Sequence, residues 1–271
     1  MRLTEYDRNA RREIEAWQHG DAGIVSKMLN WAMQPMDWVV KRVITEDIED
    51  QVDEAVSGML SMLNDASEWT YDVSEILEMA KARGIEAERI EDLRDVPLEL
   101  LDPLAREHTN ENALLAAVEG GGTGLGGAVL IAADIPLLIT INLRLIQQIG
   151  ASFGFAMTGP DYRPLVLSIF NVASSSSKEA KNEAMREASV AGAALARDQE
   201  YRGRVSGSFR EQNRHLPREI AKNILGRKLA QAIPIAGAAV GAGINYWFTT
   251  ETAETAYMLM RALYLERKDR A

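Results

Sequence analysis

Residues 120–145 read GGGTGLGGAVLIAADIPLLITINLRL, and residues 229–248 read LAQAIPIAGAAVGAGINYWF. Each stretch is about as long as the ~20 residues that a helix needs to cross a bilayer core. However, Asp134 lies in the middle of the first stretch, where an Asp costs about 2.5–3.5 kcal/mol on insertion. Both stretches also contain a proline and many weakly hydrophobic Gly and Ala residues. We therefore expect a buried helical hairpin in a soluble core, with an interfacial or re-entrant element and true spanning helices as the alternatives.

The glycines of both stretches recur at helical spacing. They form the pairs Gly120 and Gly124, Gly122 and Gly126, and Gly237 and Gly241. Residues four apart share one face of a helix, so each pair clears a stripe of side chains and lets another backbone approach closely. Glycine inside a helix costs about 1 kcal/mol relative to alanine, so such clusters usually serve packing or ligand approach. We predict that the two stretches cross glycine face to glycine face, which would bring Thr123 near Ala239.

The rest of the chain also has a helical pattern. Residues 46–63 place apolar side chains at three- and four-residue steps, with acidic residues on the opposite face. Further helices are expected to begin near Ser176 and near Pro217, and a last one covers residues 251–266. No stretch alternates apolar and polar residues between turn residues in the way that a strand does. The sequence therefore predicts an all-α fold, a multi-helix bundle built around the two Gly/Ala-rich segments.

One helix carries clear signals at both ends. Asp72 followed by Glu75 is a capping-box pattern, in which the Asp side chain accepts from the first turn of the helix and the Glu reaches back. Gly84 is suited to the left-handed residue that closes a helix. We predict a helix that begins after Asp72 and ends at Gly84.

The charge is unevenly distributed along what we expect to be a single domain, residues 1–271. Residues 1–110 contain 25 acidic and 12 basic residues, and the remainder contains 15 acidic and 18 basic residues. We expect the acidic helical part, about residues 1–108, to pack on a Gly-rich core, residues 109–271.

Most of the positive excess lies in residues 202–228, which contain eight basic and two acidic residues. This basic strip could attract the acidic part of the chain or form an ordinary solvated face. Alternatively it contacts anionic lipid headgroups, where each basic residue contributes about 1 kcal/mol. The residues that we predict for a membrane or partner contact are Arg210, Arg214, Arg218, Lys222, Arg227 and Lys228.

The composition excludes several functions. The formal charge of −10 argues against a nucleic-acid binder, because neutralising phosphates requires a basic surface. The chain has no cysteine, so disulfides, thiolate metal sites and a cysteine nucleophile are excluded. The charged N-terminal residues lack the apolar region of a secretory signal. We expect a cytoplasmic protein, peripheral to the inner face of the cell membrane.

The sequence gives little support for a metal site or a nucleotide site. The string Gly122-x-Gly124-x-x-Gly127 matches a dinucleotide fingerprint, but that motif needs a preceding strand, and residues 111–118 predict a helix. The three histidines are far apart in sequence, and we expect His108 to lie at a charged, exposed helix boundary rather than in a metal site. No P-loop or serine hydrolase motif is present. We predict no catalytic residue, no metal and no cofactor.

Five polar residues within the apolar stretches or at their edges are the candidates for a ligand site. They are Glu119, Thr123, Asp134, Asn142 and Asn245. Buried polar groups need partners, so these side chains either pair with each other or line a cavity between the two Gly-rich segments. For Asp134 there is a simpler alternative, because Ile135-Pro136 follows it: Asp134 could cap the helix that runs to about Gly150.

The same residues carry a family resemblance. Gly120–Gly127, Asp134-Ile135-Pro136 and Phe153-Gly154 together resemble the EcsC-family pattern of a Gly-rich stretch, an Asp-x-Pro and an aromatic-Gly. The run from Pro234 to Asn245 resembles the second signature of that family. The likeness covers about residues 30–265, and it departs from the family at Phe153, where a Tyr is more usual. The resemblance implies a bacterial, membrane-proximal helical protein and carries over no catalytic residue.

Three functions follow as expectations. The first is a non-enzymatic accessory protein that binds lipid, an apolar ligand or a membrane protein such as a transporter. The second is an uncharacterised, hydrolase-like enzyme with a polar pocket around Asp134. The third is a structural interaction module that forms homo-oligomers, although the sequence leaves the oligomeric state open.

Overall fold

The computed structural model describes residues 3–19, 54, 71–123, 128–157, 162–175, 178–196 and 237–270. Within these ranges the regular structure is helical and no strand is present, which confirms the all-α prediction. The helices are α1 (Glu5–His19), α5 (Val73–Ala82), the 3-10 helix η2 (Ile90–Asp95), α6 (Leu98–Thr123), α7 (Ala128–Ser152), α8 (Arg163–Ser174), α9 (Lys178–Ala196) and α11 (Gly237–Arg270). None of the described helices is both long and apolar enough to cross a membrane.

Several predictions fall outside the described residues. The helix predicted over 46–63 is described only at Glu54, which is helical. The basic strip, residues 202–228, is not described, and neither is the predicted helix start at Ser176.

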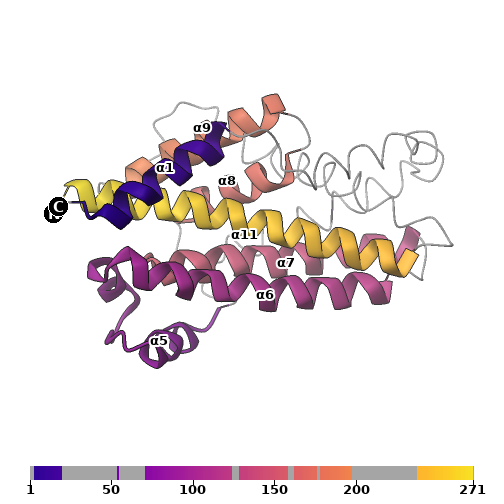
Figure 1. Cartoon of the computed structure of the whole chain (residues 1–271). Coiled ribbons are helices and arrows are strands. Elements are labelled where there is room, and N and C mark those ends of the chain that lie inside the picture. The colour runs from indigo at the N-terminus through magenta and orange to yellow at the C-terminus, as the bar shows by residue number, and fades with distance from the viewer. Residues whose placement is uncertain are drawn as a thin grey trace.

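Helix α11 is the central element of the bundle. It has 34 residues and contacts α1, α6, α7, α8 and α9. Figure 1 shows α11 between the pair α6 and α7 on one side and α1, α8 and α9 on the other. The second Gly-rich stretch and the helix predicted over 251–266 are therefore parts of one continuous helix from Gly237 onward.

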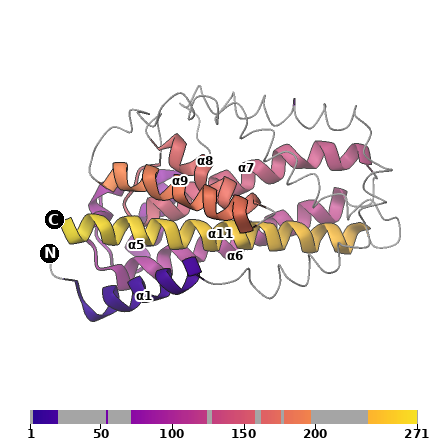
Figure 2. The same ribbon diagram turned by 90° about the horizontal axis from the view of Figure 1, so that it is seen from above.

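Helices α6 and α7 pack against each other and against α11. Asn112 on α6 bonds to Gln148 on α7, and Asn142 on α7 bonds to Thr249 on α11. Figures 1 and 2 show that the end of α6 and the beginnings of α7 and α11 lie at one end of the bundle, whereas the chain termini lie at the other. The boundary predicted at residue 108 falls within α6, so the acidic part and the Gly-rich core share this helix.

The N-cap role predicted for Asp134 is wrong. Helix α7 begins at Ala128, so the backbone of Asp134 lies inside the helix. The preceding residues, AVLIAA, are good or moderate helix formers that continue the apolar pattern, and they extend the helix past the Asp-x-Pro signal.

The caps predicted for α5 are confirmed. Asp72 accepts a hydrogen bond of 2.8 Å from the Ser74 amide, and Gly84 has a φ of +76° just beyond the helix. Glu75 faces a different partner from the one predicted, because its carboxylate lies 3.6 Å from the guanidinium of Arg144 on α7. The Asp72 cap is thus a contact within α5, whereas Glu75 links α5 to α7.

The Phe153-Gly154 pair has a specific packing role. Phe153 is fully buried, with its ring centroid 6.0 Å from that of Tyr257 and 6.3 Å from that of Tyr264. Gly154 has a φ of +86°, and a Cβ at this position would lie 2.6 Å from the backbone nitrogen of Arg94. Only glycine fits here, both for conformation and for space.

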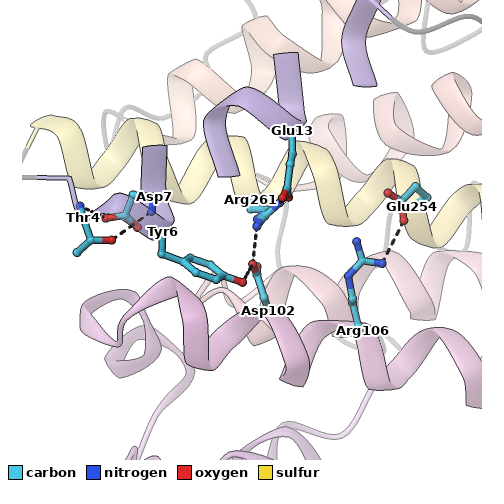
Figure 3. A network of polar contacts seen from close by, with 8 residues as sticks. All are labelled: Thr4, Tyr6, Asp7, Glu13, Asp102, Arg106, Glu254 and Arg261. Atoms are coloured by element: carbon cyan, nitrogen blue, oxygen red, sulfur yellow. Dashed lines mark hydrogen bonds and ion pairs between the residues drawn. The ribbon is translucent and has the colours of Figure 1, made fainter. Parts of the chain in front are cut away.

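A buried ion pair joins α6 to α11 at the end of the bundle where the termini lie. The Asp102 carboxylate is 2.7 Å from the Arg261 guanidinium, and the two side chains are 5% and 4% exposed. The Tyr6 hydroxyl donates to Asp102 at 2.7 Å, and Arg261 also donates to Glu13 at 2.6 Å. Figure 3 shows that Tyr6 and Glu13 reach this pair from α1. The pair therefore holds the N-terminal helix as well as two core helices.

Replacing Arg261 with Met should destabilise the protein strongly. The substitution keeps most of the side-chain volume but leaves the Asp102 carboxylate buried without its cation, which typically costs about 3–5 kcal/mol. Urea unfolding followed by circular dichroism measures the loss. Arg11→Met is the control, because Arg11 pairs with Asp269 at the surface, where the side chains are 42% and 52% exposed, and its loss should stay within about 1 kcal/mol. Equal losses in the two variants would contradict the role of the buried pair.

Candidate functional site

The end of the bundle that carries the Gly-rich stretches buries two of the predicted site residues, Asn142 and Asn245, and places a third, the half-buried Glu119, against Asn245. Asn245 on α11 donates to the Glu119 carboxylate on α6 at 3.3 Å. Asn142 on α7 donates to the backbone carbonyl of Leu138 at 2.7 Å and to the hydroxyl of Thr249 at 3.3 Å. Asn142, Asn245 and Thr249 are fully buried. The interior of this end therefore contains polar contacts among buried apolar residues such as Ile139 and Phe248.

The structure places the other two predicted residues only by their backbones. Thr123 is the last residue of α6, and Asp134 lies in the second turn of α7. A ligand site that joins Thr123 and Asp134 to Glu119, Asn142 and Asn245 stays a prediction.

The outer surface of the same end carries several exposed apolar side chains. Leu114, Leu115 and Val118 are 64%, 48% and 69% exposed, and their spacing places them together on one face of α6. Leu137 on α7 and Tyr246 on α11 are each 49% exposed. We call these five residues the apolar tip. These residues were not predicted from the sequence, because the periodicity of residues 111–118 predicts a helix but not which of its faces meets solvent.

The apolar tip reverses the usual arrangement of a soluble bundle. A surface helix normally turns its apolar stripe to the core and its polar face to water. Here Glu119 turns to Asn245 in the interior, while Val118, its neighbour in sequence, is the most exposed of the five. Contiguous exposed apolar side chains of this kind mark sites that bind proteins, membranes or apolar ligands.

The predicted glycine-to-glycine packing of the two stretches stays a prediction. Glu119 and Asn245 show that the end of α6 and the start of α11 are adjacent. Gly243 nevertheless faces open space, since a Cβ there would meet nothing within 4 Å. At least one glycine of the second stretch therefore lies away from a close backbone approach.

His108 lies in the core, not at an exposed helix boundary as the sequence predicted. It is fully buried within α6, and neither ring nitrogen has a hydrogen-bond partner among the described residues. Burial, together with the positive charges of Arg144 and Arg83, lowers the pKa of His108 to about 4. The expectation failed because the helix extends through this position, and the charged neighbours in sequence point to the other face.

The described residues offer no metal site and a poor setting for a dinucleotide. No group of three His, Cys, Asp or Glu side chains that could hold a metal occurs in the part of the chain that the structure describes. Gly122, the first glycine of the apparent fingerprint, lies inside α6, so a helix and not a strand leads into the motif. A pyrophosphate site of the dinucleotide type requires the strand.

The fold and this site define a class of protein: an α-helical bundle around one long central helix, with buried polar contacts and exposed apolar side chains at one end. The chain belongs to the EcsC protein family, whose model matches residues 8–265. The match begins earlier than residue 30, where the sequence resemblance was expected to start, because α1 belongs to the same bundle.

Two relatives from Bacillus subtilis (strain 168) are similar to this chain. Uncharacterized protein YdbA is 23% identical over 254 residues, which cover 92% of this chain and 89% of that protein. Protein EcsC is 30% identical over 149 residues, which cover 52% of this chain and 54% of that protein. No solved structure matches the chain.

The burial of His108 should make the stability depend on pH. An ordinary histidine has a pKa of 6.5 and the folded His108 has one of about 4, so the unfolded chain binds this proton first as the pH falls. The free energy of unfolding should therefore decrease between pH 6.5 and 4, by about 3 kcal/mol in total from this group. Urea unfolding at a series of pH values measures the effect.

His108→Leu provides the comparison, because it keeps an uncharged side chain at the position and cannot titrate. Subtracting its pH profile from that of the natural protein removes the contributions of all other groups, including the Asp102 and Asp7 carboxylates. Parallel profiles in this pH range would show that His108 is not buried in its neutral form.

Proposed function

We propose that this protein is a non-enzymatic accessory protein that binds the cytoplasmic face of an anionic membrane through the apolar tip. The observation that carries the proposal is the outward position of Leu114, Leu115 and Val118, which are 64%, 48% and 69% exposed. The basic strip, residues 202–228, supplies the electrostatic part of the attraction.

The apolar tip supports shallow insertion at the bilayer interface. Removing a Leu or Val side chain from water contributes up to about 1.5–3 kcal/mol, and about half of that remains available to a side chain that is half exposed. Three such residues on one face of α6 thus contribute a few kcal/mol. This is the order of energy with which interfacial helices bind membranes when anionic lipids add attraction.

An interfacial position also agrees with the helix compositions. None of the described helices is long and apolar enough to cross a membrane, and α6 exposes three apolar side chains close together, Leu114, Leu115 and Val118, while its Leu101 and Leu104 are buried. The Gly-rich residues that follow Val118 add little bulk at the same end. A bilayer surface can accept such exposed apolar side chains without a deep pocket.

The enzyme and the homo-oligomer stay as predictions. The enzyme depends on a pocket around Asp134, whose side chain is outside the described set. The homo-oligomer shares the apolar tip as its contact surface, so light scattering of the free protein separates it from membrane binding. A stable dimer that fails to bind vesicles would favour the oligomer.

Polar substitutions in the apolar tip should weaken membrane binding. The triple variant Leu114→Gln, Leu115→Gln, Val118→Gln keeps good helix formers and removes the apolar face, so its partitioning onto phosphatidylglycerol-containing vesicles should fall at least about tenfold. Flotation and sedimentation of vesicles measure the bound fraction. The matched control is Val73→Gln, Leu100→Gln, Val190→Gln, since these side chains are 41%, 44% and 48% exposed but lie elsewhere. An unmodified protein that stays soluble with such vesicles at low salt would overturn the proposal.

Neutralising the basic strip should weaken the same binding in a salt-dependent manner. The variant carries Gln at Arg210, Arg214, Arg218, Lys222, Arg227 and Lys228. Each basic residue near an anionic surface contributes about 1 kcal/mol at moderate salt, so the loss should be large at about 50 mM salt and small at about 500 mM. If the variant binds anionic vesicles as the natural protein does at both salt concentrations, the strip has no part in membrane contact.

A further inference from the structure

A second polar cluster lies between α5, α6 and α7, separate from the contacts of Asn245 and Asn142 with α11. It contains His108 and Asn112 on α6 and Arg144 and Gln148 on α7. His108, Asn112 and Gln148 are 0%, 2% and 0% exposed. Four nitrogen atoms of this cluster are buried without a hydrogen-bond partner among the described residues: both ring nitrogens of His108, Nε of Arg144 and Nε2 of Gln148.

The hydrogen bonds around Asn112 fix which end of the Gln148 amide is free. The Asn112 Nδ2 group donates to the backbone carbonyl of His108 at 2.8 Å and to Gln148 Oε1 at 2.9 Å. Only an N–H can donate to a carbonyl, so Asn112 cannot be turned round, and Gln148 must face it with its oxygen. The Gln148 Nε2 group therefore remains as an N–H donor.

Arg144 supplies a further donor and a route to solvent. It lies one turn before Gln148, so the two side chains share a face of α7. The Arg144 guanidinium is 3.6 Å from the Glu75 carboxylate, which is longer than a hydrogen bond, and the two side chains are 32% and 36% exposed. Arg144 is thus held loosely at the mouth of the cluster.

The free groups are almost all donors. A neutral imidazole carries one N–H and one acceptor nitrogen, and a protonated imidazole carries two N–H groups. With Arg144 and Gln148, His108 thus presents at least three N–H donors, and the one side-chain oxygen of these three residues, Gln148 Oε1, already accepts from Asn112. Buried donors are nearly always paired in folded proteins, so this concentration indicates a partner rich in acceptors.

We propose that His108, Arg144 and Gln148 form a binding site for a small oxyanion, such as a carboxylate or a sulfate-sized ion. The anion would accept from Gln148 and Arg144 and from the imidazole, and it would replace Glu75 as the partner of Arg144. This site is independent of the proposed membrane function, because it uses no residue of the apolar tip or the basic strip.

The charged groups around His108 favour an anion over a cation. Arg144 on α7 and Arg83 after α5 both act on the imidazole with positive charge. Glu75 on α5 opposes Arg144, and Glu107 on α6 forms an ion pair with Arg83. Once an oxyanion displaces Glu75, the imidazolium form of His108 becomes stabilised, so anion binding and protonation of His108 assist each other.

NMR titration of the histidine rings in the full chain tests the site directly. Spectra are recorded from pH 4 to 7.5 in sodium formate, in sodium sulfate and in sodium chloride at equal ionic strength, with His108 assigned by its absence in His108→Gln. The pKa of His108 should be higher in formate or sulfate than in chloride by about one to three units. The same pKa of His108 in all three salts would overturn the proposal. That result is expected if water, and not an anion, binds to the donors.

Two variants and a control sharpen the test. Arg144→Gln should abolish the oxyanion-dependent shift, whereas Glu75→Gln should reach the full shift at a lower anion concentration, because it removes the competing carboxylate. Arg89→Gln is the control, since Arg89 is 72% exposed and pairs with Asp92 away from His108, and its shift should match that of the natural protein. A shift that persists in Arg144→Gln would refute the assignment.

Thermal unfolding gives a readout that does not depend on low pH. Sulfate stabilises most proteins through exclusion from their surface, so the quantity to compare is the difference between the natural protein and Arg144→Gln. At pH 6.5 the natural protein should gain about 2–4 °C more than the variant on exchange of chloride for sulfate. Equal gains in the two proteins would count against the site.

Discussion

Because α11 is enclosed by five other helices, its polar side chains must find partners on those helices. The partners of its largely buried polar residues occur at intervals along its length: Asn245 with Glu119, Thr249 with Asn142, Arg261 with Asp102, and Lys268 with Asp7. Each contact joins α11 to a different point on α6, α7 or α1. A shift of any of these helices by one turn would leave buried polar groups unpaired, which is costly in the low-dielectric interior. This series of contacts therefore sets the register of the bundle.

The polar contacts of α11 differ in chemistry between its two ends. Near the termini the contacts are charged, and α1 covers them. Burial favours the neutral form of Asp7, but the hydrogen bonds from Lys268 and Thr4 outweigh it and lower the pKa of the Asp7 carboxyl. Burial raises the pKa of Tyr6 to about 12, and its bond to Asp102 adds to the effect. At the Gly-rich end the described contacts involve two amides, a hydroxyl and the Glu119 carboxylate, with no cation among them, and Leu114, Leu115 and Val118 of α6 face solvent.

The interface of α6 and α7 follows a third pattern, in which donors outnumber acceptors. Helix α7 uses one face for α11, through Asn142, and another for α6 and α5, through Gln148 and Arg144. The aromatic-glycine pair at the end of this helix has a purely steric task. Phe153 fills the space beside Tyr257, and Gly154 lets the chain pass close to Arg94. A hydroxyl on residue 153 is therefore not required for packing here.

The sequence by itself determined the features that depend on neighbouring residues. Periodicity predicted an all-α chain, Asp72 and Gly84 predicted the ends of α5, and the Gly-rich motifs predicted the family. These succeed because helix formation and capping are local. Polarity within apolar sequence also predicted that Asn142 and Asn245 are interior residues, since such groups are rare in cores without partners. The same local reasoning failed at Asp134, where helix propensity in the preceding residues was stronger than the cap signal.

Only the tertiary structure decided which residues meet and which face of a helix is covered. Asp102 and Arg261 pair across the length of the chain, and Glu75 reaches Arg144 instead of its own helix start. His108 is buried and Val118 is exposed, although both lie on α6 among polar and apolar neighbours that suggest otherwise. The helical repeat defines the faces of a helix but not its rotation about its own axis. That rotation is set by the neighbouring helices, and it decides where the donors of His108 and the apolar tip point.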